Sequence, residues 1–322
     1  MPRNGRRALV AAACLAAGPV PHLTGQSLPP YAPMNPVAYG RSGLQTAPYR
    51  EPARGWRFTV LTDYASLIEI ARLPATTFTL DAELLRLDVT VSRDIGKRIF
   101  VFGGTSLNGA YDGFLDGFLD WYHDLIGLGG EARAERPKNE FLYELELADG
   151  TRIVRPNPGE WIGDLRIGAG VRHTVHWQST AWVTLPLSEE PDGFRRGVVS
   201  ANLVTTLRAR FATIFTYEGS IGVGWAGREG DLEDLQRTTF ALVSSGLRAR
   251  TIGPLNLYAN LVYHSPYYRN AGLRSLDNRE LTIDVGGIFR FASGPEWILG
   301  LTEDLEPRGP AVDLSFRIGA RW

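Results

Sequence analysis

The chain contains very little cysteine and lysine, and no long hydrophobic run follows its first residues. Cys14 is the only cysteine among 322 residues, which excludes disulfides and thiolate chemistry from the rest of the chain. Apart from Lys97 and Lys138, arginine supplies the positive charge, and the formal net charge of -1 gives no electrostatic basis for binding nucleic acid. Because no later segment has about 18 consecutive apolar residues, a transmembrane helix is excluded.

The first 27 residues are typical of an export signal. Arginines near the start precede the apolar run ALVAAACLAAG, and a proline-rich stretch follows. Without a clear cleavage motif, the cut falls anywhere from about Gly18 to Ser27. Two alternatives to an ordinary signal stay open, a twin-arginine signal at Arg6-Arg7 and a lipidated Cys14. An exported chain without membrane helices is periplasmic, secreted or an outer-membrane barrel.

Apolar and polar residues alternate through most of the remaining chain. In the last stretch, AVDLSFRIGARW, Leu314, Phe316 and Ile318 share one face, and Arg317 and Arg321 share the other. The same period of two recurs in LNLYANLVYH and LTIDVGGIFRF. This period predicts β-strands with one apolar face and one polar face.

Twelve such strands are predicted, at 56–70, 76–92, 98–108, 162–172, 177–187, 198–211, 213–225, 239–251, 254–264, 280–291, 296–304 and 311–322. Short turns and longer polar loops alternate between them, which is typical of bacterial outer-membrane barrels with an even number of strands. The predicted organisation is a signal peptide at 1–27, a proline-rich periplasmic segment at 28–55, and a barrel at 56–322 with a loop insertion at 109–161. A soluble β-sandwich is the alternative, but it would not need charges on one face of almost every strand.

The polar strand faces would line the lumen of this barrel. The arginines expected there are Arg208, Arg210, Arg248, Arg250, Arg317 and Arg321, and the expected carboxylates include Asp63, Asp81, Glu83 and Asp284. One strand breaks step at Leu84-Leu85, which predicts a β-bulge. At the end of the chain we interpret Phe316, Ile318 and Trp322 as the barrel-assembly signal.

The segment YDGFLDGFLDWYHDLIGL, at 111–128, places an aspartate at every fourth position. On a helix the polar residues share one side, and they are Asp112, Asp116, Asp120, His123 and Asp124. We interpret this side as solvated or facing the lumen, where the helix would act as a lid or constriction opposite the arginines. A divalent-cation site and a catalytic centre are alternatives. Residues 140–155 predict a hairpin in the same loop.

Several stretches carry a resemblance to a known family. They are NPVAYGRSGLQTAP, LTDYAS followed by LDAELLRLDVTVSRDIG, DGFLDGFLDWYHDLIGLGGEARAERPKN, and WIGDLRIGAGVRH. Together with the C-terminal strand they cover most of the chain after the signal, and the third is the most specific. The chain resembles the Gram-negative outer-membrane barrel proteins known only as a domain-of-unknown-function family. The resemblance implies an outer-membrane barrel with no established activity, so it assigns no catalytic residue.

The sequence favours a passive channel or transporter for a small solute in the bacterial outer membrane. The alternatives are a barrel-embedded lipid hydrolase and a non-conducting structural or surface-interaction protein. No serine and histidine on one strand face identify a catalytic site, and we expect no cofactor and no metal. The expected partners are outer-membrane lipid, lipopolysaccharide and the barrel-assembly machinery, without nucleic acid. The oligomeric state stays open.

Overall fold

The structure is a computed structural model of the chain. It describes residues 27–35, 42–74, 76–126, 136–155, 157, 159–187, 197–212, 214–251, 253–306 and 309–322. The predicted signal peptide, including Cys14, falls outside these residues except for Ser27 at its end. The predictions of its type and cleavage site therefore stay predictions.

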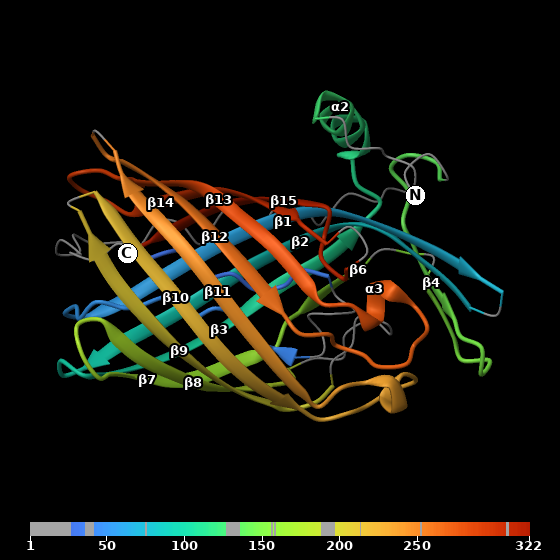
Figure 1. Ribbon diagram of the computed structural model, residues 1–322, viewed down its shortest axis with the longest axis horizontal. Coiled ribbons are helices and arrows are strands. Elements are labelled where there is room, and N and C mark those ends of the chain that lie inside the picture. Colours follow the sequence, from blue (N-terminus) through green and yellow to red (C-terminus); the bar gives the residue numbers. More distant parts are fainter. Residues whose placement is uncertain are drawn as a thin grey trace, which may run out of the picture.

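Twelve antiparallel strands form a closed barrel (Figure 1). They are β1 (Trp56–Leu73), β2 (Thr76–Ile95), β3 (Ile99–Tyr111), β7 (Leu165–Arg172), β8 (Trp177–Leu185), β9 (Ser200–Phe211), β10 (Phe215–Ala226), β11 (Thr239–Arg250), β12 (Leu255–His264), β13 (Glu280–Arg290), β14 (Glu296–Asp304) and β15 (Leu314–Arg321). Each pairs with its neighbours, and β15 closes the barrel on β1 from Thr59↔Arg321 to Ser66↔Leu314. The predicted fold class is confirmed, because each of the twelve predicted strands is present with nearly the predicted bounds.

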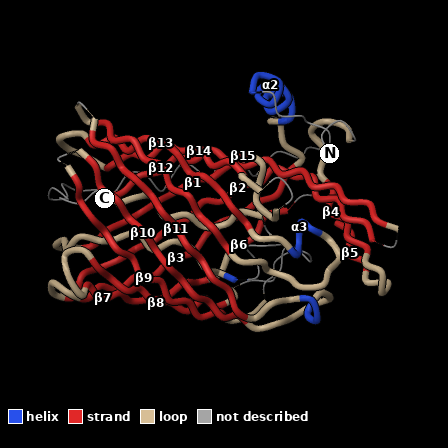
Figure 2. The backbone as a smooth tube through the Cα atoms, viewed as in Figure 1, coloured by secondary structure: helices blue, strands red, loops and turns tan. Residues whose placement is uncertain are grey.

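The connections between strands differ in length at the two ends of the barrel (Figure 2). At the short-turn end the strands join through a few residues, as at 96–98 and 173–176, and the C-terminus lies there. The long-loop end carries α2 (Asp116–Ile126), β4 (Leu142–Glu146), β5 (Arg152–Arg155), β6 (Gly159–Ile162), η2 (Glu233–Leu235) and α3 (Arg274–Asp277). The β4–β5 hairpin lies beside the start of β2, because β4 pairs with it from Thr77↔Glu146 to Asp81↔Leu142. None of the helices in the described part of the chain is long and apolar enough to span a membrane.

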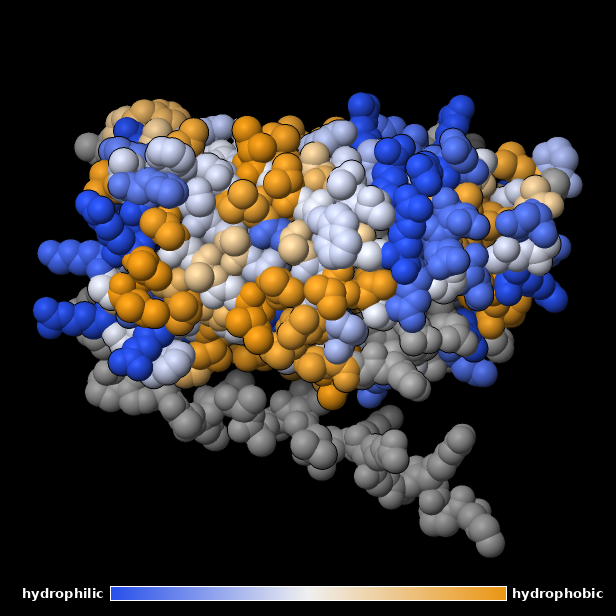
Figure 3. All heavy atoms as spheres, turned by 90° about the horizontal axis from the view of Figure 1, so that it is seen from below, coloured by the Kyte–Doolittle hydropathy of each residue, from blue (hydrophilic) through white to orange (hydrophobic). Residues whose placement is uncertain are grey.

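The outer wall of the barrel is apolar in its middle. Strand side chains alternate between outward and inward positions, so that on β10 Ile221 and Val223 point outward while Ser220 points inward. The outward ones are highly exposed, Ile221 to 67%. Figure 3 shows that apolar residues spread over the middle of the wall and that hydrophilic residues gather toward both ends. A belt of exposed apolar side chains of this kind is typical of a wall that faces lipid.

Strand β2 carries no bulge at Leu84-Leu85, so that prediction is wrong. Its pairing with β1 runs without interruption from Trp56↔Arg93 to Leu73↔Thr76. The apolar residues change face because the strand changes surroundings along its length. Toward the short-turn end the outward positions, such as Val89, are apolar and face the belt. Toward the long-loop end the inward positions are apolar and pack in a core.

Because the apolar residues of β2 change face, two carboxylates that were expected in the lumen lie on the outer side of the barrel. Asp81 and Glu83 share the outward face of β2 with Leu85 and Val89, so the prediction that they line the lumen is wrong. Asp81 forms an ion pair of 2.6 Å with Arg136 in the long loop. The point between Leu84 and Leu85 therefore marks where β2 leaves the apolar belt.

Inside the barrel, Arg317 links the strands on both sides of the closing seam. Its guanidinium binds Asp63 of β1 at 2.6 Å and Asp284 of β13 at 2.9 Å. Asp63 also pairs with Arg86 of β2 at 3.0 Å, and the Tyr258 hydroxyl donates to Asp284 at 3.1 Å. All five side chains are buried. The charges compensate one another across β1, β2, β12, β13 and β15, which is what a buried ion-pair network requires.

Replacement of Asp63 with alanine should destabilise the barrel by about 3–5 kcal/mol, because it leaves Arg86 and Arg317 buried without their shared carboxylate. The free energy of unfolding in urea, followed by tryptophan fluorescence of protein in lipid vesicles, measures the change. Arg210→Gln is the control, since the Arg210–Glu51 pair of 3.3 Å lies at the exposed rim. Its effect should stay below about 1 kcal/mol. Equal effects of the two substitutions would contradict the role of the network in closure.

Candidate functional site in the barrel lumen

The residues that precede the first strand lie inside the barrel. We call residues 27–35 and 42–53 the lumen segment. Its first arm starts at the short-turn end, where Arg321 donates hydrogen bonds to the Ser27 hydroxyl and carbonyl at 3.1 and 3.2 Å. It reaches the long-loop end, where the Tyr31 hydroxyl donates to Glu280 at 2.5 Å. Tyr267 donates to the other oxygen of this carboxylate at 2.8 Å. The first arm therefore runs through the lumen lengthwise.

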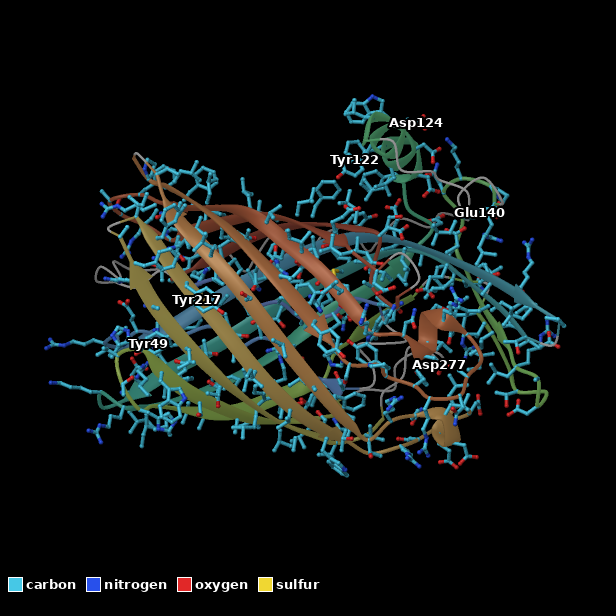
Figure 4. The ribbon with its side chains drawn as sticks, in the orientation of Figure 1. Tyr49, Tyr122, Asp124, Glu140, Tyr217 and Asp277 are labelled. Carbon is cyan, nitrogen blue, oxygen red and sulfur yellow. The ribbon has the colours of Figure 1, made fainter. Side chains whose placement is uncertain are left out.

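The second arm returns to the short-turn end. Ser42 lies 3.1 Å from His264 at the long-loop end of β12, and the Tyr49 hydroxyl donates to the Thr174 carbonyl in the β7–β8 turn at 3.0 Å. Figure 4 shows Tyr49 at that end of the barrel. The arms contact each other, since the Thr46 amide donates to the Tyr31 carbonyl at 2.9 Å. The lumen segment thus forms an irregular hairpin inside the barrel.

This position differs from the predicted periplasmic location of residues 28–55, which is wrong for the described residues up to Ala53. The proline-rich sequence has no alternating pattern, so it gives no sign of joining the wall. Polar groups on the wall satisfy its backbone instead. The buried Glu218 carboxylate accepts from the amides of both Leu28 and Tyr49 at 3.4 Å. Gln178 binds the Pro48 carbonyl at 2.9 Å and the Arg50 amide at 2.8 Å.

Glycines on the inward wall allow the lumen segment to approach closely. A Cβ atom placed on Gly224 would lie 3.4 Å from the Leu44 Cβ, and one on Gly246 would lie 2.3 Å from the Leu28 side chain. Sequence reasoning missed these positions. The available signal was glycine at inward positions of strands that otherwise carry polar residues there, as at Gly222 and Gly224 in IGVGW. Glycine within a strand often marks the close approach of another backbone.

The six arginines predicted in the lumen divide into two groups. Arg208, Arg248 and Arg317 are buried inside the barrel, and Arg321 is half-buried beside the first arm. Arg208 holds the second arm through Glu51 at 2.5 Å. The exposed Arg210 and Arg250 end their strands at the short-turn rim. Arg208 and Arg321 therefore contact the lumen segment, whereas Arg317 binds Asp63 and Asp284 of the wall and Arg248 binds Thr216 of β10.

A cavity of about 540 Å³ lies between the lumen segment and the wall. It reaches from the short-turn rim, at Trp322 and Ser293, to Asp63 and Trp182 farther along the barrel. Aromatic side chains, among them Phe100 and Trp182, form part of its lining. Cavities that hold small ligands have similar volumes and combine apolar walls with a few polar groups.

The lining of this cavity carries an excess of positive charge. It includes six arginines (Arg50, Arg57, Arg86, Arg166, Arg290 and Arg321) and four carboxylates (Glu51, Asp63, Asp88 and Glu296). Most of these arginines pair with carboxylates, as Arg321 does with Glu296 at 3.2 Å. Among the described residues, Arg50 and Arg290 have no carboxylate within ion-pair distance. The Nε of Arg50 is buried without a hydrogen-bond partner, and its guanidinium lies 4.9 Å from the Phe100 ring centre.

Ser42 and His264 form a serine–histidine contact that sequence reasoning missed, because the two residues are far apart in the chain. The side chains are 1% and 0% exposed, and neither lines the cavity. The second ring nitrogen of His264 binds the Ser265 carbonyl at 2.6 Å, so a carbonyl stands where a catalytic triad has a carboxylate. This contact anchors the lumen segment, and its geometry does not favour a lipid hydrolase.

Helix α2 packs on the outer wall of the barrel. Leu115 and Leu119 are buried against Leu314 of β15, and the Phe118 ring meets the Phe316 ring edge to face at 5.8 Å. Leu314 and Phe316 point outward, on the opposite face from Arg317. The helix therefore lies outside the lumen, and the prediction of a lid or constriction opposite the lumen arginines is wrong for this structure.

The acidic side of α2 faces the long loop and solvent. Asp116 accepts from the Asn139 amide at 2.6 Å, and Asp120 forms an ion pair with Lys138, whose pKa rises because of the hydrogen bond and the charge of Asp120. Asp112 and Asp124 are exposed. The side chain of His123 falls outside the described residues. Within the described part of the chain, no three histidine, cysteine, aspartate or glutamate side chains gather as a metal site.

Residues 44–322 match the family described as "Protein of unknown function (DUF3187)". The chain belongs to this family. The matched range begins in the second arm of the lumen segment and includes every strand of the barrel. No curated protein matches the chain.

Solved outer-membrane barrels have a similar fold. The COG4313 outer membrane channel from Pseudomonas putida F1 is 12% identical, with a TM-score of 0.51, and the match covers 84% of this chain and 97% of that chain. The toluene transporter TodX from Pseudomonas putida is 12% identical, with a TM-score of 0.41 over 90% of this chain and 96% of that one. The toluene transporter TbuX from Ralstonia pickettii is 9% identical, with a TM-score of 0.38 over 84% and 88%. At 12% identity, the similarity to the COG4313 channel shows a shared fold and nothing about function.

The predicted barrel-assembly residues have different surroundings. Trp322 exchanges backbone hydrogen bonds with Phe58 of β1, Ile318 points outward and is exposed, and Phe316 packs against α2. All three residues therefore lie at the seam where β15 and the C-terminus meet β1. The role of the three residues in assembly stays a prediction.

Replacement of Tyr31 with phenylalanine should loosen the lumen segment without changing the barrel. A hydrogen bond to a charged group contributes about 1.5–3 kcal/mol, so the amides of Tyr31 and Thr46 should exchange at least about tenfold faster. Hydrogen–deuterium exchange of the protein in lipid, read by mass spectrometry, measures this. Tyr267→Phe removes the other bond to Glu280 and should leave these amides unchanged. Equal acceleration in both variants would mean that Tyr31 does not anchor the segment.

Proposed function

We propose that the protein is a bacterial outer-membrane channel for a small solute, and that the lumen segment must shift before the solute can pass. The observation that carries this proposal is the course of the lumen segment, which runs through the barrel and back beside a cavity open to the short-turn rim. The barrel fold and the apolar belt support placement in the outer membrane, surrounded by lipid and lipopolysaccharide. The barrel-assembly machinery would insert it, with the long loops outside the cell and the short turns in the periplasm.

The contacts of the lumen segment are suited to reversible release. The segment joins no strand of the wall by backbone pairing among the described residues. Side-chain hydrogen bonds, the Arg208–Glu51 ion pair and the burial of Leu28 and Leu44 hold it instead. A hydrogen bond between neutral groups contributes only about 1 kcal/mol net, because water can replace it. Ala53, near the start of β1, stays tied to the wall through Asp94 at 2.5 Å. The segment can therefore swing as a tethered piece of chain while the barrel stays closed.

The charge of the cavity favours an anionic solute. Arg50 and Arg290 line it without a carboxylate partner, and a guanidinium binds carboxylate or phosphate groups through paired hydrogen bonds. Phe100 and Trp182 offer apolar surface beside these charges. A small organic anion with an apolar body fits this combination.

Locking the lumen segment to the wall should close the channel. The chain from Ser27 onward has no cysteine, so Leu44→Cys combined with Gly224→Cys introduces its only two thiols. The Cβ separation of 3.4 Å is close to the range of about 3.5–4.5 Å found in disulfides. The Asn202 side-chain oxygen lies 2.5 Å from the new Cβ and can rotate away. In planar-bilayer recordings, the oxidised variant should lose its openings and regain them after reduction.

Each single cysteine variant under the same oxidant is the matched control, and both should open as the parent chain does. Openings that persist in the fully cross-linked protein would contradict movement of the segment. Silence of the reduced protein and of the parent chain, with the barrel folded and inserted, would favour the non-conducting structural protein.

Removal of the positive charges of Arg50 and Arg290, which have no carboxylate partner, should weaken the preference of the channel for anions. Arg50→Gln together with Arg290→Gln should lower the permeability of chloride relative to potassium by about fivefold, because less positive charge faces the permeating ion. The reversal potential of open events in a potassium chloride gradient gives this ratio. Arg250→Gln is the control, since Arg250 is exposed and does not line the cavity. An unchanged ratio in the double variant would remove the basis for an anionic solute.

A further inference from the structure

Helix α2 presents three different faces around its circumference. Successive residues advance by about 100°, so that the sides carrying each kind of residue can be read from the sequence. The buried Leu115 and Leu119 form the face against the barrel wall. The acidic face carries Asp116, Asp120 and Asp124. The third, which we call the free apolar face, consists of Phe114 just before the helix, Phe118, Trp121 and Leu125.

The free apolar face is open to the surroundings in the folded chain. Phe114 is 70% exposed, Trp121 58% and Leu125 67%. These side chains form a contiguous group, since Phe118 lies 5.7 Å from Trp121 between ring centres. Large apolar side chains grouped in this way mark a surface that another apolar phase or a partner covers.

The contacts of α2 fix the direction in which each face points. The acidic face binds Lys138 and Asn139, which belong to the long loop between α2 and β4. The free apolar face points the other way along the barrel. Phe114 stacks on Tyr64 at 5.5 Å, and Phe118 meets Phe316 at 5.8 Å.

Tyr64 and Phe316 are register partners on the outer wall. They lie nearer the short-turn end than Leu314, against which the buried face of the helix packs. Figure 4 shows Asp124 on the side of α2 toward the long-loop end. The acidic face therefore points away from the apolar belt, and the free apolar face points toward it.

The helix also sits at the level where the wall leaves the apolar belt. The residues just before the helix are held by Glu83, which accepts from the amides of Phe114, at 2.7 Å, and Leu115. Glu83 directly precedes the point between Leu84 and Leu85 at which β2 changes its apolar face. The Tyr64 hydroxyl donates to the same carboxylate at 2.5 Å. In Figures 1 and 2 the helix is seen nearly end-on, so its axis crosses the long axis of the barrel.

We infer that α2 lies in the plane of the membrane at its outer surface, with the free apolar face among the acyl chains of the outer leaflet. An amphipathic helix in this setting buries its apolar side by several ångströms and keeps its charged side in water. The same lipid that covers Tyr64, Phe316 and Ile318 on the wall would continue over Phe118, Trp121 and Leu125. The occupant is therefore hydrocarbon, and the inference rests on the proposed placement in the outer membrane.

The absence of cysteine from Ser27 onward allows each side chain to be tested by one spin label. The variants are Trp121→Cys and Leu125→Cys on the free apolar face, Asp124→Cys on the acidic face, and Ile221→Cys in the apolar belt. Ile221 and Leu125 are both 67% exposed, and Asp124 is exposed too, so the protein itself shields none of them. Collision of each label with oxygen, which concentrates in hydrocarbon, and with a water-soluble nickel complex is measured in proteoliposomes containing lipopolysaccharide.

We expect the ratio of oxygen to nickel collisions at Trp121 and Leu125 to approach that at Ile221 and to exceed that at Asp124. If Ile221 is lipid-like while Trp121 and Leu125 are as water-exposed as Asp124, the inference is wrong and the barrel placement stands. If Trp121 and Leu125 are shielded from both reagents, a protein or a second copy covers the face, which also overturns the inference. A water-exposed Ile221 would contradict the proposed membrane placement, and the inference would fall with it.

Discussion

The lumen of a barrel with twelve strands is the constraint on which the rest of this structure depends. Eight strands leave an interior that side chains fill, and 16–18 strands leave an open aqueous channel. The intermediate lumen here is filled by the chain's own lumen segment. The inward faces follow from this, because they must offer partners to an irregular backbone. Glu218 and Gln178 bind its amides and carbonyls, and Gly222, Gly224 and Gly246 leave room for it.

Charge inside the barrel has two separate tasks. The Asp63–Arg317–Asp284 network compensates its own charges and ties the closing seam. Nearer the short-turn rim the balance is broken, since Arg50 and Arg290 face the cavity without a carboxylate. The first arrangement stabilises a closed wall, and the second leaves positive charge facing the cavity, on which the proposed preference for an anion rests.

The strands could be predicted from sequence because a lipid-facing wall imposes a period of two on each of them. The inward direction of Arg208, Arg248 and Arg317 followed from the same period. The lumen segment could not be predicted, because proline-rich chain without a period contains no information about which side chains satisfy its backbone. Only the inward glycines signalled it.

For helix α2, too, one part could be predicted from sequence and another could not. Residue spacing predicts its acidic and apolar sides, but it does not say whether a two-faced helix packs inside a lumen or outside a wall. The change of face at Leu84-Leu85 is visible in the sequence, but alternation alone does not distinguish a bulge from an unbroken strand whose surroundings change along its length.

In the proposed function, the lumen segment fills a barrel that would otherwise conduct. This can be tested by the single-channel conductance of a chain lacking residues 28–49, compared with that of the chain from Ser27 onward. We expect brief openings for the longer chain and a persistent, larger conductance for the shortened one. Equal conductance of the two folded and inserted proteins would contradict it.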